Sequence, residues 1–279
     1  MDFKKEIVIS CRMSNQNPLQ SPAGAQTVDR ACQLIKEIAR AGTGGARILD
    51  LCTVTGLSRP TVHRILLALC AADFIHQNPK TKHYCLGTEL FVLGLSAPSP
   101  IAALPEVTKL IDSLAQQTQD TAYLMLRSHD DAVCAWRGVG AFPITANIVV
   151  AGDRRPLAAS VAGLCILAAL PRADAQAIME SNRPYLPDYC RATTSQLQAH
   201  IESGQETGHI VGENLVMEGV TAVGIVVPTL SVQPYLGISI SGIASRFTRQ
   251  RMPELLALLK QTSQRIARIV DGAGARSVK

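Results

Sequence analysis

Hydrogen-bonding and basic side chains are concentrated between residues 58 and 64, where hydroxyl, imidazole and guanidinium groups occur within seven residues. Groups of this kind bind the phosphates and the base edges of duplex DNA. The apolar residues of the same segment recur at helical spacing and predict a buried stripe formed by Val62, Ile65, Leu66 and Leu69. The candidate DNA contacts are Ser58, Arg59, Pro60, Thr61, His63 and Arg64. We expect this helix to present them to a major groove.

A second basic site is predicted at a turn that contains Lys80 and Lys82. Short segments at residues 74–77 and 83–86 flank the turn and have the pattern of two strands of a hairpin. The two ammonium groups at its tip can approach phosphates or a minor groove. The hairpin therefore has the properties of a DNA-binding wing.

The elements before the hairpin must hold the polar helix in place. We expect Thr27 to cap a first helix, and we expect a second, short helix over residues 48–55. Gly56 suits a left-handed turn, after which Ser58 is expected to cap the third helix. Pro60 falls in the first turn of that helix, where its missing N–H costs nothing. The order is that of a helix-turn-helix.

A solvated surface helix, whose charges serve only solubility, is the alternative for residues 58–64. Two arginines at this spacing would by themselves favour that alternative. Three short helices, a glycine turn and a basic hairpin in this order favour DNA binding instead. We therefore predict a winged helix-turn-helix domain at residues 27–87.

Prolines and polar residues divide the rest of the chain. Residues 1–26 are predicted to be a disordered tail, because their polar, proline-broken end has no face to bury. An apolar helix and a break at Ala97–Pro100 predict a linker helix and hinge over residues 88–100. Residues 101–279 then form a larger domain.

The C-terminal domain is expected to mix helices with antiparallel strands. Periodicity and turn residues predict helices over 107–114, 161–170, 173–181, 195–207 and 248–270, and strands over 122–127, 132–137, 221–228 and 235–241. This mixture indicates an α+β fold with an antiparallel sheet at its centre.

Composition sets the broad class. The chain has 279 residues, is 47% hydrophobic and 18% charged, and carries a formal net charge of +5, which permits an anionic partner without requiring one. Its eight cysteines form no C-x-x-C pair, so we expect buried reduced thiols and neither a metal nor another cofactor. No signal peptide and no membrane span are expected, which points to the cytoplasm.

The sequence resembles the IclR-type transcriptional regulators. The resemblance is carried by Thr-Gly-Leu-Ser-Arg-Pro-Thr-Val-His-Arg-Ile-Leu from Thr55 to Leu66 and by Lys-His-Tyr-Cys-Leu-Gly from Lys82 to Gly87. It continues through Gly-Glu-Asn-Leu-Val-Met-Glu-Gly-Val from Gly212 to Val220 and Leu-Gly-Ile-Ser-Ile-Ser-Gly from Leu236 to Gly242. The resemblance implies a winged helix, a linker helix and a GAF-like domain that binds a small effector. It also implies homodimers that pair into tetramers.

By the same resemblance, three segments of the C-terminal domain line an effector cavity. The residues concerned are Leu157, Val161, Ala162, Gly212, Val220, Ala222, Ser239 and Ser241. The two serines share one face of a strand and can donate hydrogen bonds to a carboxylate, although they can equally serve to satisfy backbone groups. Arg127, Trp136 and Arg137 are further candidates for the border of the cavity.

The predicted cavity departs from the family in its polar groups. Gly212 and Ala222 stand where relatives often have an acid and a thiol, so the wall is more apolar. We expect a small carboxylate effector with an aromatic or branched skeleton, and not a two-carbon acid such as glyoxylate.

Function is therefore expected to be regulation of transcription at a double-stranded DNA operator. A repressor is favoured, and an activator of a catabolic operon with the same architecture is the alternative. An enzyme is a remote alternative with no catalytic residues assigned, because the nucleophile elbow, the zinc-protease motif, the phosphate loop and the dinucleotide fingerprint are all missing. A purely architectural DNA binder would not need the large second domain.

Overall fold

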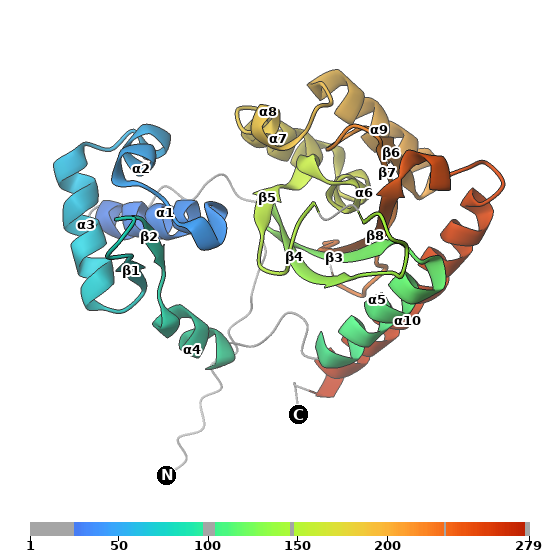
Figure 1. Ribbon diagram of the computed structural model, residues 1–279, viewed down its shortest axis with the longest axis horizontal. Helices are drawn as coiled ribbons and strands as arrows, with labels where there is room; N and C mark the ends of the chain where they lie inside the picture. The colour runs from blue at the N-terminus through green and yellow to red at the C-terminus, as the bar shows by residue number, and fades with distance from the viewer. Residues whose placement is uncertain (1–24, 97–103, 146–147, 232, 277–279) are drawn as a thin grey trace, which may run out of the picture. The chain divides into compact units, whose positions relative to one another are not determined.

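A computed structural model describes residues 25–96, 104–145, 148–231 and 233–276. Contacts divide the described chain into an N-terminal unit, which holds residues 25–38 and 46–90, and a C-terminal unit, which holds Ala39–Gly45 and the described residues from Phe91 onward (Figure 1). Residues 1–24 of the predicted tail and the predicted break at Ala97–Pro100 lie outside the described residues. Each unit has its own hydrophobic core.

The N-terminal unit contains three helices and a small hairpin. Its elements are α1 (Gln26–Arg40), α2 (Ile48–Thr55), α3 (Arg59–Ala71), β1 (Ile75–Gln77) and β2 (Tyr84–Leu86). A short 3-10 turn at Gly42–Gly44 lies between α1 and α2 in the sequence. Gly56 ends α2 in the left-handed conformation, with φ of 66°, as the turn between α2 and α3 requires. Tyr84 also bonds to Ala46 in both directions at 2.9 Å, which extends the hairpin by a third strand-like segment.

Helix α4 (Thr88–Ser96) follows the hairpin. Unlike the other long helices, it has no buried residue, and Phe91 and Leu95 are about 70% exposed (68% and 71%). An apolar helix of this kind carries a surface that the described residues do not cover.

The C-terminal unit is built on a six-stranded antiparallel sheet. The strands are β3 (Thr121–Ser128), β4 (Asp131–Gly138), β5 (Arg154–Pro156), β6 (Ile210–Glu213), β7 (Val220–Val226) and β8 (Leu236–Ile243). Their spatial order is β5-β4-β3-β8-β7-β6, and every neighbouring pair is antiparallel. The α+β fold class is confirmed.

Helices cover both faces of this sheet. One face packs against α5 (Leu104–Thr118) and α10 (Met252–Arg276), which lie side by side in Figure 1. The other face packs against α6 (Val161–Ala169), and α7 (Arg172–Asn182), α8 (Leu186–Tyr189) and α9 (Thr194–Thr207) complete this layer. Strand alternation explains the division, since Leu124 and Ile238 face α5 and α10, whereas Tyr123 and Met125 face α6.

Three elements of the C-terminal unit were not among the predicted ones. They are the three-residue strand β5, the one-turn helix α8 and the edge strand β6. Each is short, and β5 and β6 depend on pairing with β4 and β7 for their extended shape. Such elements lack a periodic apolar pattern of their own.

Candidate nucleic-acid interface and effector cavity

Helix α3 buries one face and exposes the other. Its buried residues are Val62, Ile65, Leu66 and Leu69, the four that helical spacing selects. Ser58, Arg59, Pro60, His63 and Arg64 are exposed, and Thr61 is half-buried. The structure thus brings the six candidate contacts of this helix together on and beside its solvent-facing first turns.

Ser58 does not cap α3 through its side chain, contrary to the expectation from sequence. Its hydroxyl lies 2.9 Å from the hydroxyl of Thr61, one turn later. The two hydroxyls therefore satisfy each other and form one small polar group at the start of the helix.

The two arginines of this face have no partner within the described chain. Neither Arg59 nor Arg64 makes an ion pair or a side-chain hydrogen bond with a described residue. Exposed guanidinium groups of this kind can bind phosphates or make paired hydrogen bonds to guanine.

The hairpin turn holds two lysines in a defined shape. The side-chain oxygen of Asn78 accepts hydrogen bonds from the amides of Lys80 (2.9 Å) and Thr81 (3.2 Å). The backbone of Lys82 has a left-handed φ of 60°, and its carbonyl accepts a 3.0 Å bond from the Gln77 amide group. Lys80 and Lys82 are both exposed, so their ammonium groups are open to an anionic partner.

Arg47 is a neighbouring cation that sequence reasoning missed. It precedes α2, is exposed, and donates from Nε to the His83 ring at 3.2 Å, beside the hairpin. Arg47 precedes α2 and so belongs to no helical pattern of charged residues that would mark it in the sequence. The bond to His83 becomes visible only once the segment before α2 pairs with β2.

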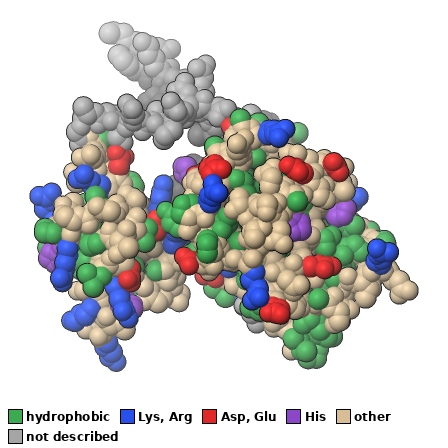
Figure 2. Space-filling model, turned by 90° about the horizontal axis from the view of Figure 1, so that it is seen from above, with side chains coloured by type: hydrophobic (Ala, Val, Ile, Leu, Met, Phe, Trp, Pro, Cys, Tyr) green, Lys and Arg blue, Asp and Glu red, His purple; other side chains and the backbone are tan. Residues whose placement is uncertain are grey.

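Charge is unevenly divided between the N-terminal and the C-terminal parts of the described chain. Residues 25–96 contain eight Lys and Arg against five Asp and Glu, whereas residues 104–276 contain fifteen of each. Figure 2 shows Lys and Arg side chains distributed around the surface of the N-terminal unit. The excess positive charge of the described chain thus belongs to the unit that carries α3 and the hairpin, where it can attract a polyanion.

The C-terminal unit contains a cavity between the sheet and the start of α6. Its free volume is about 50 Å³. Six of the eight residues predicted from the sequence lie in its wall, namely Val161, Gly212, Val220, Ala222, Ser239 and Ser241. Eight further residues line it, namely Tyr123, Met125, Ile148, Val149, Arg155, Ser160, Leu215 and Val216. Of these, Leu215 and Val216 lie within the predicted segment from Gly212 to Ala222, and the other six were not predicted.

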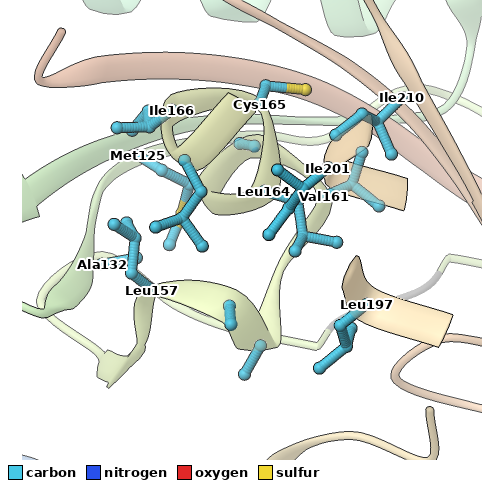
Figure 3. Packing of buried hydrophobic residues seen from close by; sticks show 14 of the residues in the cluster. Met125, Ala132, Leu157, Val161, Leu164, Cys165, Ile166, Leu197, Ile201 and Ile210 are labelled. Carbon is cyan, nitrogen blue, oxygen red and sulfur yellow. The ribbon is translucent and has the colours of Figure 1, made fainter. Parts of the chain in front are cut away.

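Leu157 and Ala162 do not line the cavity, which corrects the prediction for these two residues. Leu157 is fully buried in the hydrophobic cluster between the sheet and α6. Figure 3 shows Leu157 next to Ala132. Ala162 follows Val161 on a helix, so the two side chains point about 100° apart and only Val161 reaches the cavity. The backbone of Ala162 packs instead against Gly237. A Cβ added at Gly237 would lie 2.6 Å from the carbonyl oxygen of Ala162.

The three border candidates also lie outside the wall. Arg127 donates to the backbone of His129 and to Gln233, and the indole of Trp136 donates to Asp112 at 2.9 Å. Arg137 comes nearer, because it donates to the carbonyl of Val149 at 3.2 Å, but it is not a lining residue.

Two polar groups that sequence reasoning missed change the character of the cavity. Arg155 is 8% exposed, and burial lowers the pKa of its guanidinium. Tyr123 is 4% exposed, burial raises the pKa of its phenol, and the phenol oxygen accepts the Ile148 amide at 3.3 Å. Arg154 and Arg155 lie on opposite faces of β5 because side chains alternate along a strand. The sequence did not reveal this, because the three-residue strand β5 was not predicted.

The described cysteines are free thiols, and most are at least half-buried. Burial raises the pKa of Cys134 to about 11 and that of Cys165 to about 12, so neither thiol ionises near neutral pH. Cys32 is exposed, which contradicts its expected burial; Cys11 lies outside the described residues.

The described ranges contain no helix that is long and apolar enough to cross a membrane. Within those ranges, no cluster of three or more His, Cys, Asp or Glu residues could hold a metal ion.

Two family models match the chain. Residues 102–268 match the C-terminal domain of bacterial IclR transcriptional regulators, and residues 27–79 match the IclR helix-turn-helix domain. Together with the exposed face of α3 and the hairpin, these matches identify the protein. The chain belongs to the IclR family of transcriptional regulators.

Curated relatives of this IclR-family regulator are DNA-binding proteins. The chain is 24% identical over 254 residues to the DNA-binding transcriptional repressor YiaJ of Escherichia coli, covering 89% of each chain. It is 23% identical over 251 residues to the acetate operon repressor of Salmonella typhimurium, covering 88% of this chain and 90% of that one. The relatives are regulators of transcription and not enzymes, and their partner is DNA.

Solved structures share the fold. An IclR-family regulator from Brucella abortus superposes with a TM-score of 0.69 at 18% identity, covering 86% of this chain and 91% of that one. An IclR homologue from Microbacterium hydrocarbonoxydans, solved with 4-hydroxybenzoate, gives a TM-score of 0.65 at 14% identity, covering 88% and 99%. That neighbour is bound to a small molecule.

Proposed function

We propose that this IclR-family regulator is a cytoplasmic repressor that binds its operator as a homodimer and is controlled by a small carboxylate. The observation that carries the proposal is the exposed, unpaired basic face of α3, with Arg59 and Arg64 beside Thr61 and His63. A helix with this face fits a major groove, and the hairpin lysines fit the adjoining phosphates. Residues 27–87 would bind DNA, residues 88–100 would link the two parts, and residues 101–279 would bind the effector.

Repression is favoured over activation by the names of the relatives, several of which are repressors. An activator would have the same two units, so the basic face of α3 does not separate the two roles. A reporter gene placed behind the operator does so, because loss of the protein raises expression from a repressed promoter and lowers it from an activated one.

A homodimer is proposed because one winged helix covers only one half-site. Most soluble oligomers are symmetric, and a two-fold dimer binds two inverted half-sites about one helical turn apart. Two such dimers would form the tetramer that the family resemblance implies. Light scattering of the protein–DNA complex distinguishes the alternatives, and a single chain bound to the operator would contradict the proposal.

The DNA-binding proposal is tested on an operator selected from random duplexes with the native protein. We expect Arg59→Ala and Arg64→Ala each to weaken operator binding by about 1 to 3 kcal/mol, because each removes a charged group that bonds to a base or a phosphate. Gel-shift titration at one fixed salt concentration measures the change. Arg183→Ala, which removes an exposed arginine at the end of α7, is the matched control and should bind like the native protein.

The thermal transition of each variant must stay near that of the native protein, since both arginines lie on the exposed face of α3. If the two variants keep full operator affinity, the assignment of α3 as the DNA-reading helix is wrong.

A further inference from the structure

Arg155 is a buried cation in the wall of the cavity. It lies in the edge strand β5, where it pairs with Ala132 of β4. Successive residues of a strand face opposite sides. Arg154 accordingly makes a 2.9 Å ion pair with Asp131, whereas Arg155 takes part in the cavity wall and is only 8% exposed.

The guanidinium of Arg155 has few partners among the described residues. Its Nη2 donates to the carbonyl of Ile148 at 3.3 Å, and its enclosed Nε has no partner. Asp153 is close in sequence, but its carboxylate accepts the amide of Val150 at 2.8 Å and forms no ion pair with Arg155 in the described chain. A buried charge that forms no ion pair is unfavourable, so an anion that enters the cavity would offset that cost.

The same wall contains a hydroxyl without a partner. Ser241 is 2% exposed and its Oγ makes no hydrogen bond with a described residue. Ser239 lies two positions earlier on β8 and therefore faces the same side, opposite Tyr123 of β3. Ser160 is not available in the same way, because its hydroxyl accepts the amide of Gly163 at the start of α6.

The remainder of the wall is largely apolar, and the free space is small. Met125, Val149, Val161 and Leu215 are among the lining residues. The free volume of about 50 Å³ is roughly a third of an engineered apolar cavity that binds benzene. A short aliphatic chain therefore fits this wall better than an aromatic ring does.

We propose that the effector is a small aliphatic monocarboxylate and that Arg155 selects its charge by neutralising the carboxylate. The Ser241 hydroxyl donates a hydrogen bond to the same carboxylate. This inference rests on the proposed control by a carboxylate. Arg155 is the one charged residue of the described wall and matches one carboxylate, and the second carboxylate of a diacid would find no cation among the lining residues. The branched carbon skeleton expected from the sequence is retained, and the aromatic one is given up.

The test uses four probe molecules on the full chain. Calorimetry compares 2-methylpropanoate with its neutral amide, which has nearly the same shape, with butanedioate, which has two charges, and with benzoate, which has a ring. We expect the monocarboxylate to bind on the order of tenfold tighter than the amide, because a hydrogen-bonded charge contributes that much in an apolar wall. Butanedioate and benzoate should bind more weakly than 2-methylpropanoate.

Variants assign the effect to the residue. Arg155→Met should weaken 2-methylpropanoate by on the order of tenfold or more and leave the amide unchanged, and Arg155→Lys should restore part of the loss. Ser241→Ala should give a smaller loss for the acid. Arg183→Met, which removes an exposed arginine of the same unit, should bind all four probes like the native protein.

Three results overturn the inference. They are equal binding of the acid and its amide, unchanged acid binding by Arg155→Met, and no binding of any monocarboxylate to the native protein. If an uncharged metabolite nevertheless releases the operator, effector control survives and only the role of Arg155 fails. If Arg59→Ala and Arg64→Ala keep operator affinity, the proposed DNA binding fails whatever the cavity binds.

Discussion

Asp120 and Arg155 are both buried charges of the C-terminal unit, but their surroundings differ. The carboxylate of Asp120 is 1% exposed and pairs with Arg246 at 2.7 Å and with Arg251 at 2.8 Å. The guanidinium of Arg155 is buried beside a cavity and pairs with no carboxylate of the described chain. The fold thus supplies the counter-charge for one group and leaves a space beside the other.

The difference separates a structural charge from a binding charge. The Asp120 cluster ties the start of β3 to the segment before α10, since both arginines also donate to the carbonyl of Thr118. Removing one member of such a cluster leaves the other charges buried without their ion-pair partner, which lowers the stability of the fold. Within the described chain, Arg155 makes one hydrogen bond, to the Ile148 carbonyl, and no ion pair, so its retention in the interior is better explained by an incoming anion.

Exposed arginines form a third case. Arg59 and Arg64, like Arg155, form no ion pair with a described carboxylate, but water solvates them and no cost of burial arises. An unpaired charge on the surface of α3 is therefore ordinary by itself, and it indicates DNA binding only because of its position in a winged helix. An unpaired charge in the interior is informative without such context.

The largest expected effect is on the Asp120 cluster. We expect Asp120→Ala to lower the free energy of unfolding of the C-terminal unit by about 3 to 5 kcal/mol, because it leaves two arginines facing each other without their carboxylate. Urea titration followed by circular dichroism measures the change. Asp188→Ala, which removes an exposed carboxylate from α8, is the control and should shift the free energy by less than about 0.5 kcal/mol. A small effect of Asp120→Ala would remove the contrast with Arg155.

Arg155 should behave in the opposite way without ligand. We expect Arg155→Met to leave the free energy of unfolding unchanged or to raise it by up to about 2 kcal/mol, since an apolar side chain of similar length avoids the buried charge. The same urea titration in ligand-free buffer tests this. A loss comparable to that of Asp120→Ala would mean that Arg155 is a structural residue, and its assignment to the effector would lose its main physical support.

The DNA-binding face could be predicted because exposure follows a helical period. The buried stripe of α3 contains the four predicted residues, so the exposed positions follow by elimination. The hydrogen bond of Ser58 was not predictable in this way. Whether its hydroxyl caps the backbone or bonds to Thr61 depends on side-chain rotation, which spacing does not determine.

The cavity could be predicted only in part. Ser239 and Ser241 alternate on a long strand, and Gly212 and Ala222 lie across from each other on paired strands, so these segments were found together. Arg155 was missed because β5 has three residues and owes its extended shape to β4. Leu157 was misplaced because its 3-10 turn directs it into the core, and no periodic pattern marks so short a turn.

The smallest expected effect concerns the hairpin, where the charges are exposed and act through long-range attraction. We expect Lys80→Gln together with Lys82→Gln to weaken the binding of all duplexes similarly and to reduce the salt dependence of log K by about 0.9 for each phosphate that is no longer neutralised. Glutamine keeps the Cβ at Lys82, so the left-handed backbone there is strained no more than in the native chain. The bonds from the Lys80 and Thr81 amides to Asn78 involve backbone groups and remain, which preserves the turn.

Gel-shift titrations of the operator and of an unrelated duplex, each at several salt concentrations, measure both quantities. Gln198→Ala on α9 serves as a neutral surface control, and its salt dependence should match that of the native protein. If the double variant instead loses affinity for the operator alone, with the salt dependence unchanged, the hairpin reads base sequence. Its two exposed lysines would then contact bases, as proposed for Arg59 and Arg64 of α3.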